Sequence, residues 1–235
     1  MKTLNTYLNE SLFDDEDVLS DPERDKLIIE NWIKENYVIK GTLKINNDLT
    51  VDCKGDVEVV NNDIEYLTNG LFRWGKIDGS FYCNDCKNLE SLEGSPEEVG
   101  WNFYCIGCKN LRSLEGAPRK IVNGTFDCSS CDKIKDLEGA PEYVKGDFYC
   151  TGCKNLSSLK GTLKEVGNNL ICYDCKNLKT LKGSPEEVGG NFNCLFCHKL
   201  KTLEGAPKWV GGSFNCKNCK NLKITDADRT KYNIS

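Results

Sequence analysis

The sequence predicts a repeat solenoid, in which short right-handed coils stack on one another with a parallel β-sheet along one side. Two observations predict this fold. A Cys-x-x-Cys motif recurs seven times, and successive first cysteines are 22, 23, 22, 22, 22 and 22 residues apart. Most copies also carry apolar residues of the same kind at the same spacing, so a single coil needs its neighbours to bury its apolar side chains.

The repeat reads Phe-x-Cys-x-x-Cys-x-x-Leu-x-x-Leu-x-Gly-x-Pro-x-x-Val, as in residues 192–210. Phe and the first cysteine are two residues apart, which is the spacing of one face of a strand, so both are expected to point inward. The two leucines are three residues apart, which suits a tight 3₁₀-like or irregular return. Gly-x-Pro then ends that return, because proline disfavours helix in the preceding residue. The one longer step comes from a residue added between Ile121 and Phe126.

Stacked coils bring like residues together at about 4.8 Å, so each inward position is expected to become a ladder inside the solenoid. The first cysteine fills a strand position that suits a small buried hydrophobe. The two predicted cysteine ladders consist of Cys83, Cys105, Cys128, Cys150, Cys172, Cys194 and Cys216, and of Cys86, Cys108, Cys131, Cys153, Cys175, Cys197 and Cys219.

The repeat of residues 81–222 resembles the leucine-rich-repeat family, and within it the bacterial BspA-like class, where Phe-x-x-Cys-x-x-Leu and a later Pro-x-x-Val recur with a similar period. The resemblance implies a leucine-rich-repeat solenoid, mostly β. It also implies that the second cysteine, a position commonly held by Asn or Cys in that class, reaches backbone groups in the bend. The coils are slightly shorter than the norm of the class, which leaves the form of the return open.

The repeats divide the chain into an N-terminal helical segment (1–37), a cap with a degenerate first coil (38–80), seven repeats (81–222) and a tail (223–235). Asp21 and Pro22 are a strong helix start, with Asp as N-cap. One face of that helix is predicted to carry Leu27, Ile28, Trp32 and Ile33.

The cap is predicted to hold three short strands, 38–45, 49–53 and 57–60, with Gly55 separating the last two. Residues 61–77 resemble one coil without its Pro and second cysteine. The polar tail after Ile224 is expected to be too short for a robust cap, so that end is expected to fray or to associate with a second copy.

The first residues carry their own signals. Residues 3–13 are compatible with an amphipathic helix, and an acidic run, 14–17, follows. The opening MKTLNTYLNESLFDDED resembles the leader of some tailed-phage virion proteins, which implies a virion protein as an alternative function and location. The same residues lack the continuous apolar stretch of a signal peptide, so a cytoplasmic protein is expected, with its 15 cysteines as thiols.

Composition excludes several partners. The chain has 31 basic and 36 acidic residues and a net charge of −5, which argues against nucleic-acid binding. No run of about 18 apolar residues is present, so no membrane span is predicted.

The cysteines are the main candidates for chemistry. Cys-x-x-Cys is a zinc-ligand spacing, and two coils would supply four sulfurs, so a zinc-stabilised array is one alternative. Seven pairs do not group into fours, however, and buried thiols are the preferred interpretation, without metal or cofactor. The only histidine, His198, has no evident catalytic partner, so the sequence does not favour an enzyme.

The outward strand positions favour a non-enzymatic protein-binding or scaffolding function. They vary from coil to coil, and they hold tyrosines and aliphatic residues that a water-facing sheet does not require. Simple cross-strand stacking that stabilises the sheet is the alternative. The candidate binding residues are Tyr82, Tyr104, Ile106, Tyr149, Ile171, Tyr173 and Leu195.

Overall fold

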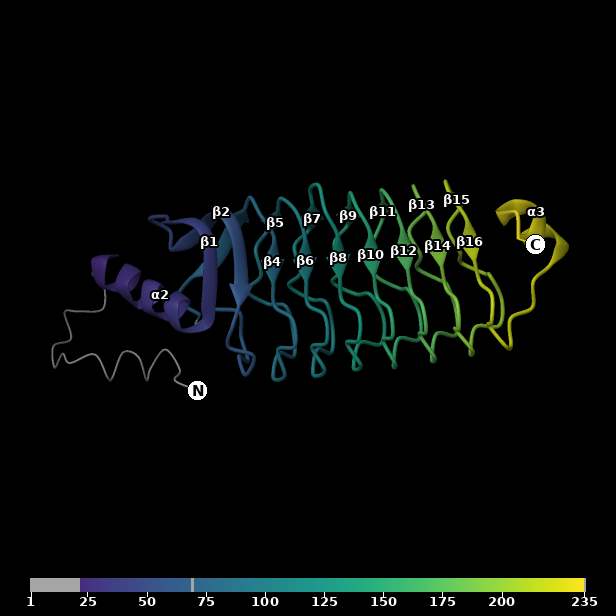
Figure 1. Cartoon of the computed structure of the whole chain (residues 1–235), viewed down its shortest axis with the longest axis horizontal. Helices are drawn as coiled ribbons and strands as arrows, with labels where there is room; N and C mark the ends of the chain where they lie inside the picture. Colours follow the sequence, from purple (N-terminus) through teal and green to yellow (C-terminus); the bar gives the residue numbers. More distant parts are fainter. Residues whose placement is uncertain (1–21, 69, 235) are drawn as a thin grey trace.

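Two ladders of short parallel strands run the length of the molecule, and Figure 1 shows the coils stacked side by side. The computed structural model describes residues 22–68 and 70–234. Each repeat contributes one two-residue strand to the first ladder, and the first six repeats also contribute one to the second; these strands pair in parallel with their counterparts in neighbouring coils. The chain is therefore a repeat solenoid and mostly β, as the sequence predicts.

We name the ladders after their commonest inward residues. The Phe ladder contains β4 (Phe81–Tyr82), β6 (Phe103–Tyr104), β8 (Phe126–Asp127), β10 (Phe148–Tyr149), β12 (Leu170–Ile171), β14 (Phe192–Asn193) and β16 (Phe214–Asn215). The Val ladder contains β3 (Arg73–Ile77), β5 (Glu98–Val99), β7 (Lys120–Ile121), β9 (Tyr143–Val144), β11 (Glu165–Val166), β13 (Glu187–Val188) and β15 (Trp209–Val210). The sequence pattern predicts strands only at the Phe position of each repeat, and the strands of the Val ladder are an addition to that prediction.

The interior consists of aligned like residues. The rings of Phe81 and Phe103 stack with centroids 5.4 Å apart and an interplanar angle of 7°. Phe126 and Phe148 continue this stack at 5.2 Å. All of these rings are fully buried. Since burying one large apolar side chain contributes about 1.5–3 kcal/mol, the ladders are the main source of stability.

The return between the ladders is irregular, and among the described residues no 3₁₀ helix forms there. Each return makes isolated turn bonds, such as Leu111 N–H to Cys108 O at 3.1 Å, before the chain bonds to the coil beside it. Glycine ends the return because Gly116 has φ 88°, and a Cβ there would lie 2.4 Å from the nitrogen of Glu93. The added residue of the longer coil lies in the bend between β7 and β8, whose pairings stay in register.

The N-terminal cap is a hairpin of β1 (Tyr37–Ile45) and β2 (Thr50–Val59). The prediction that Gly55 separates two strands is wrong, since β2 runs through it opposite Gly41. A Cβ at Gly41 would lie 2.1 Å from the carbonyl oxygen of Lys54, so close backbone approach requires glycine there. Because β2 pairs with both β3 and β4, it starts both ladders.

Helix α2 (Pro22–Asn36) lies across this end of the solenoid (Figure 1). Its predicted start at Pro22 is confirmed, and Tyr37 already belongs to β1. The helix buries Ile28, Ile29, Trp32 and Ile33. Leu27 was assigned to the same face wrongly and is 55% exposed, because helical periodicity places Ile29 there instead. The predicted N-cap Asp21 and the predicted helix 3–13 lie outside the described residues.

The C-terminal tail forms a short helix, α3 (Asp226–Tyr232), which was not predicted and which has no buried residue. Thr225 and Asp228 start it with a capping box. The ring of Tyr232 stacks on Phe214 at 4.4 Å, and its hydroxyl donates to the carbonyl of Pro207 at 2.8 Å. The tail thus covers the last Phe of the ladder. Neither α2 nor α3 is long and apolar enough to cross a bilayer.

Candidate binding surface and cysteine ladders

The cysteines of both ladders are buried and free. From the second repeat onward, the thiol of each second cysteine donates to the carbonyl of the first cysteine in the preceding coil, at 3.0–3.2 Å. Cys108, for example, reaches the carbonyl of Cys83. The second cysteine therefore satisfies a buried backbone acceptor, which is the role that the resemblance implies for it.

Burial raises the pKa of the Cys83 and Cys105 thiols. At the two ends of the array, burial is the main cause that raises the pKa of Cys53 and of Cys216 to about 11. Among the described residues no three Cys, His, Asp or Glu side chains gather as a metal-ligand set. The thiols of the second cysteines donate hydrogen bonds to carbonyl oxygens of the preceding coil, and these bonds stabilise the stack of coils.

The predicted binding residues all lie beside the Phe ladder, in two groups. In the first group, the rings of Tyr82 and Tyr104 contact each other with centroids 5.4 Å apart, so cross-strand stacking accounts for this pair. Asp127 ends the group. It is not an apolar contact residue, because its carboxylate accepts the backbone N–H of Ser129 at 2.8 Å.

The second group is mostly apolar, although Asn193 pairs with Ile171 on the following strand. Tyr149 pairs with Ile171 on the next strand, and the ring of Tyr173 lies edge-on to Phe196 with centroids 5.5 Å apart. Leu195 precedes Phe196 in the next coil, and Tyr173 is 38% exposed. We call Ile171, Tyr173, Leu195 and Phe196 the aromatic patch.

Phe196 has an unfavourable backbone conformation and was not among the predicted residues. Its φ is 60°, in the left-handed region that bulky side chains avoid. Its N–H bonds to the carbonyl of Lys217 at 3.3 Å, so the turn is held by the neighbouring coil. The same position in other coils holds residues that tolerate this conformation, namely Asp85, Gly107, Ser130, Gly152, Asp174 and Asn218. Aligned repeats hold Asp, Asn, Ser or Gly at this turn position, and Phe196 is the exception. The exception is visible in the sequence and could have marked Phe196 as a candidate binding residue.

The outward side of the Val ladder differs from the aromatic patch. Ion pairs join its coils there, such as Lys76 with Glu98 at 3.3 Å and Lys208 with Glu186 at 2.7 Å. These pairs are exposed and contribute about 0–1 kcal/mol each. Exposed aromatic residues also occur on this side, since Tyr143 of β9 and Trp209 of β15 are 43% and 53% exposed, so the Val ladder combines ion pairs with single aromatic side chains.

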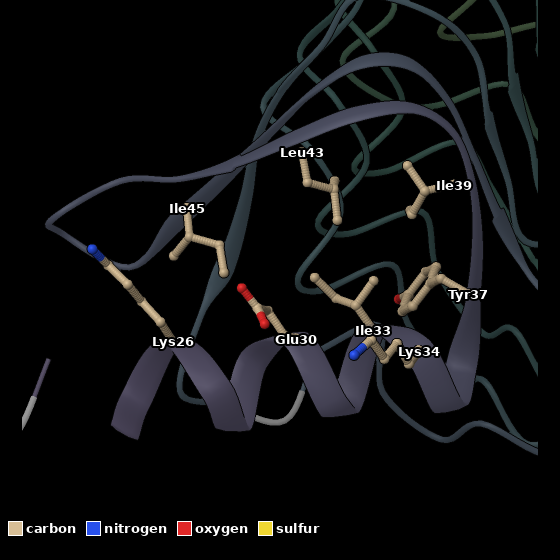
Figure 2. A pocket seen from close by; sticks show the side chains of 8 residues that line it. All are labelled: Lys26, Glu30, Ile33, Lys34, Tyr37, Ile39, Leu43 and Ile45. Carbon is tan, nitrogen blue, oxygen red and sulfur yellow. The ribbon is translucent and has the colours of Figure 1, made fainter. Parts of the chain in front are cut away.

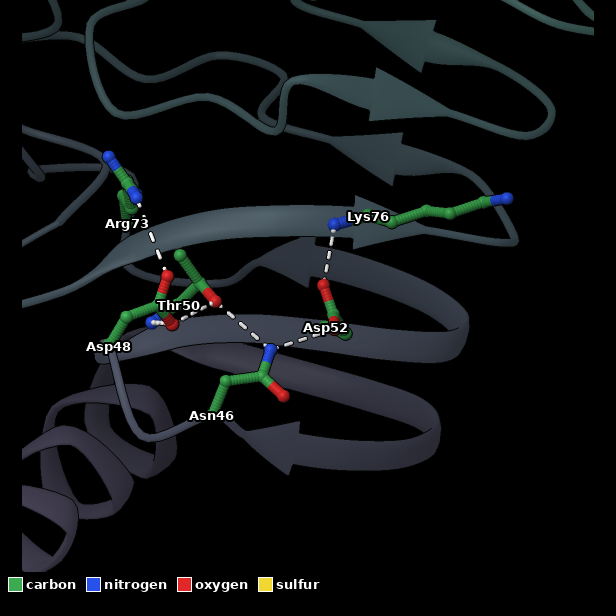
Figure 3. Close-up of polar contacts among 6 residues, drawn as sticks. All are labelled: Asn46, Asp48, Thr50, Asp52, Arg73 and Lys76. Atoms are coloured by element: carbon green, nitrogen blue, oxygen red, sulfur yellow. Dashed lines mark hydrogen bonds and ion pairs between the residues drawn. The ribbon is translucent and has the colours of Figure 1, made fainter.

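A polar cluster closes the turn between β1 and β2 (Figure 3). The amide of Asn46 donates to Asp52 at 2.8 Å, and the other Asp52 oxygen accepts the N–H of Lys76 at 2.8 Å. These hydrogen bonds hold the pKa of Asp52 below its usual value, and a hydrogen bond from the Thr50 hydroxyl does the same for Asp48. The cluster's polar groups bond to one another, so we interpret it as a support for the hairpin.

No protein-family model, curated protein or solved structure matches the chain. The relation to the leucine-rich-repeat family stays a prediction from the repeat.

Proposed function

We propose that this protein is a non-enzymatic binding module, and that a protein partner docks on the aromatic patch. The single observation that carries the proposal is Phe196, a bulky apolar residue at a turn position that disfavours it. Residues in such backbone conformations cost about 1–3 kcal/mol and cluster at functional sites.

The composition of the patch supports the same conclusion. Aromatic residues at the centre of an interface supply a large share of binding free energy when a partner covers them. Tyr173 and Phe196 contact each other, and Ile171 and Leu195 are further apolar residues of the same two coils. The buried thiols of the two ladders suit a reducing compartment, and a cytosolic location is part of this proposal.

Phe196→Asn tests the proposal, because Asn218 holds the same position in the next coil with φ 61°. The substitution removes the aromatic ring and also relieves the backbone strain. We therefore expect the variant to stay folded, so that a loss of binding reports the loss of the ring. We expect the affinity for partners captured from cell extract, measured by calorimetry on the purified pair, to fall at least tenfold.

Tyr66→Ser is the matched control, because Tyr66 is 62% exposed and lies outside the patch. Its affinity for the same partners should equal that of the unchanged protein. Equal binding by the Phe196→Asn variant would contradict the proposal.

A further inference from the structure

A groove of about 570 Å³ lies between α2 and β1 at the N-terminal end (Figure 2). Ile33 of α2 and Tyr37 are its buried residues. The half-buried side chains of β1 complete its apolar wall, and Lys26, Glu30 and Lys34 of α2 form its polar rim. The apolar wall consists of Ile39, Leu43 and Ile45.

The groove depends on the alternation of β1. Odd-numbered residues face it, whereas Val38, Lys40, Thr42 and Lys44 are exposed on the opposite side of the strand. Among residues 22–68 and 70–234, β1 pairs only with β2 and is the last strand at this end. Within that part of the chain, the groove presents an open apolar surface on the strand that closes the solenoid.

We propose that residues 4–13 of the same chain occupy this groove, with Leu4, Leu8 and Leu12 facing β1. Leucines spaced by four residues form one stripe of a helix, and an apolar stripe of this kind is what a groove of this shape accepts. The partner is thus a defined segment of this protein, and its site is separate from the aromatic patch.

Chain length and charge support this occupant. The residues between Phe13 and Pro22 span about 28 Å when extended, at ~3.3–3.6 Å per residue, whereas α2 is about 22 Å long. The segment can therefore turn back and lie along α2. The acidic run 14–17 would then enter near Lys26 in the second turn of α2.

Cleavage after Glu10 by a glutamate-specific protease tests the proposal on the full-length protein. A synthetic peptide of residues 1–21 gives the rate for an undocked segment. We expect cleavage in the full-length protein to be at least tenfold slower than in the peptide. Leu43→Asp should restore the peptide rate, because it places a charge in the apolar wall.

Val38→Asp is the matched control, because it adds the same charge to the exposed side of the same strand. Cleavage after Glu10 should stay slow in this variant. Leu8→Asp provides a second test that leaves the described fold untouched, and it should also bring cleavage to the peptide rate.

Three results would overturn the proposal. The first is cleavage of the unchanged protein at the peptide rate. The second is equal rates for Leu43→Asp and Val38→Asp. The third is protection that grows with protein concentration, which would place the segment on a second copy.

Discussion

The two ends of the solenoid are closed by very different structures. At the N-terminal end, Tyr37, Trp74 and Phe81 form one cluster of buried rings beneath α2 and the β1–β2 hairpin. At the C-terminal end, α3 has seven residues, none of them buried, and it covers the last coil with one tyrosine ring. The last coil is accordingly less covered, since Phe214 and Cys219 keep 7% and 9% exposure, whereas equivalent residues further inside have none.

This difference indicates that stability is graded along the array. Each coil of a solenoid contacts only its neighbours, so inner coils with the same contacts have similar stability. The coverage of the two end coils therefore decides where unfolding begins. We expect opening to begin at the C-terminal coils and the N-terminal hairpin to be the last part to unfold.

The largest effect is expected at the N-terminal end. Trp74→Ala removes a fully buried ring from the hairpin's core and should lower the free energy of unfolding by about 3–5 kcal/mol. Trp209→Ala is the control, because Trp209 is 53% exposed and its loss should change stability by about 0.5 kcal/mol or less. Urea denaturation measures the free energy of unfolding of both variants. Equal decreases in that free energy would contradict a difference in stability between the two ends.

Tyr232→Ala should have a smaller effect. It removes one ring stack and one hydrogen bond, worth together about 2 kcal/mol. Because that contact closes only the last coil, amide hydrogen exchange should accelerate around residues 192–216 and stay unchanged in β2. Uniform acceleration along the chain would show that the coils open as one unit.

Alkaline pH should weaken the fold by about 1 kcal/mol for each end thiol at pH 10. Folding raises the pKa of Cys53 and Cys216 to about 11, so their contribution is complete below about pH 9 and is lost as pH rises through 11. Thermal unfolding under reducing conditions from pH 7 to 10 measures this loss. Alkylation at pH 9 should modify Cys216 before Cys150, and the reverse order would contradict the graded stability.

Phe196→Asn should have the smallest effect, and in the opposite direction. Relieving the left-handed turn should stabilise the protein by about 1 kcal/mol and raise Tm by about 2–4 °C. The coil that contains Phe196 adjoins the last coil. The substitution should therefore reduce the difference in local stability between the C-terminal and N-terminal ends. An unchanged or lower Tm would show that the turn carries no strain.

The repeated interior could be predicted from the sequence, because each inward residue recurs at one spacing. The strands of the Val ladder could not, since two extended residues carry no periodicity of their own. Gly55 was read as a break, although glycine also serves where two strands approach closely. Helix α3 was not predicted because the tail is mostly polar. The capping box at Thr225 and the single aromatic residue Tyr232 are the features that indicate it.

The candidate site was predicted only in part. The outward tyrosines were found from the strand alternation. Phe196 was not predicted, because strand alternation says nothing about a turn position. Its positive φ becomes evident only when equivalent positions of the repeats are compared.

The register of the coils also bears on how such a gene can change. Each coil meets the next through the same backbone bonds, and the bend between β7 and β8 accommodates an extra residue without disturbing the pairings on either side. Duplication or deletion of one 22-residue unit would therefore leave the remaining coils joined as before. Each new unit would add a new set of outward positions, so the length and composition of the outer surface can evolve separately from the interior that supports it.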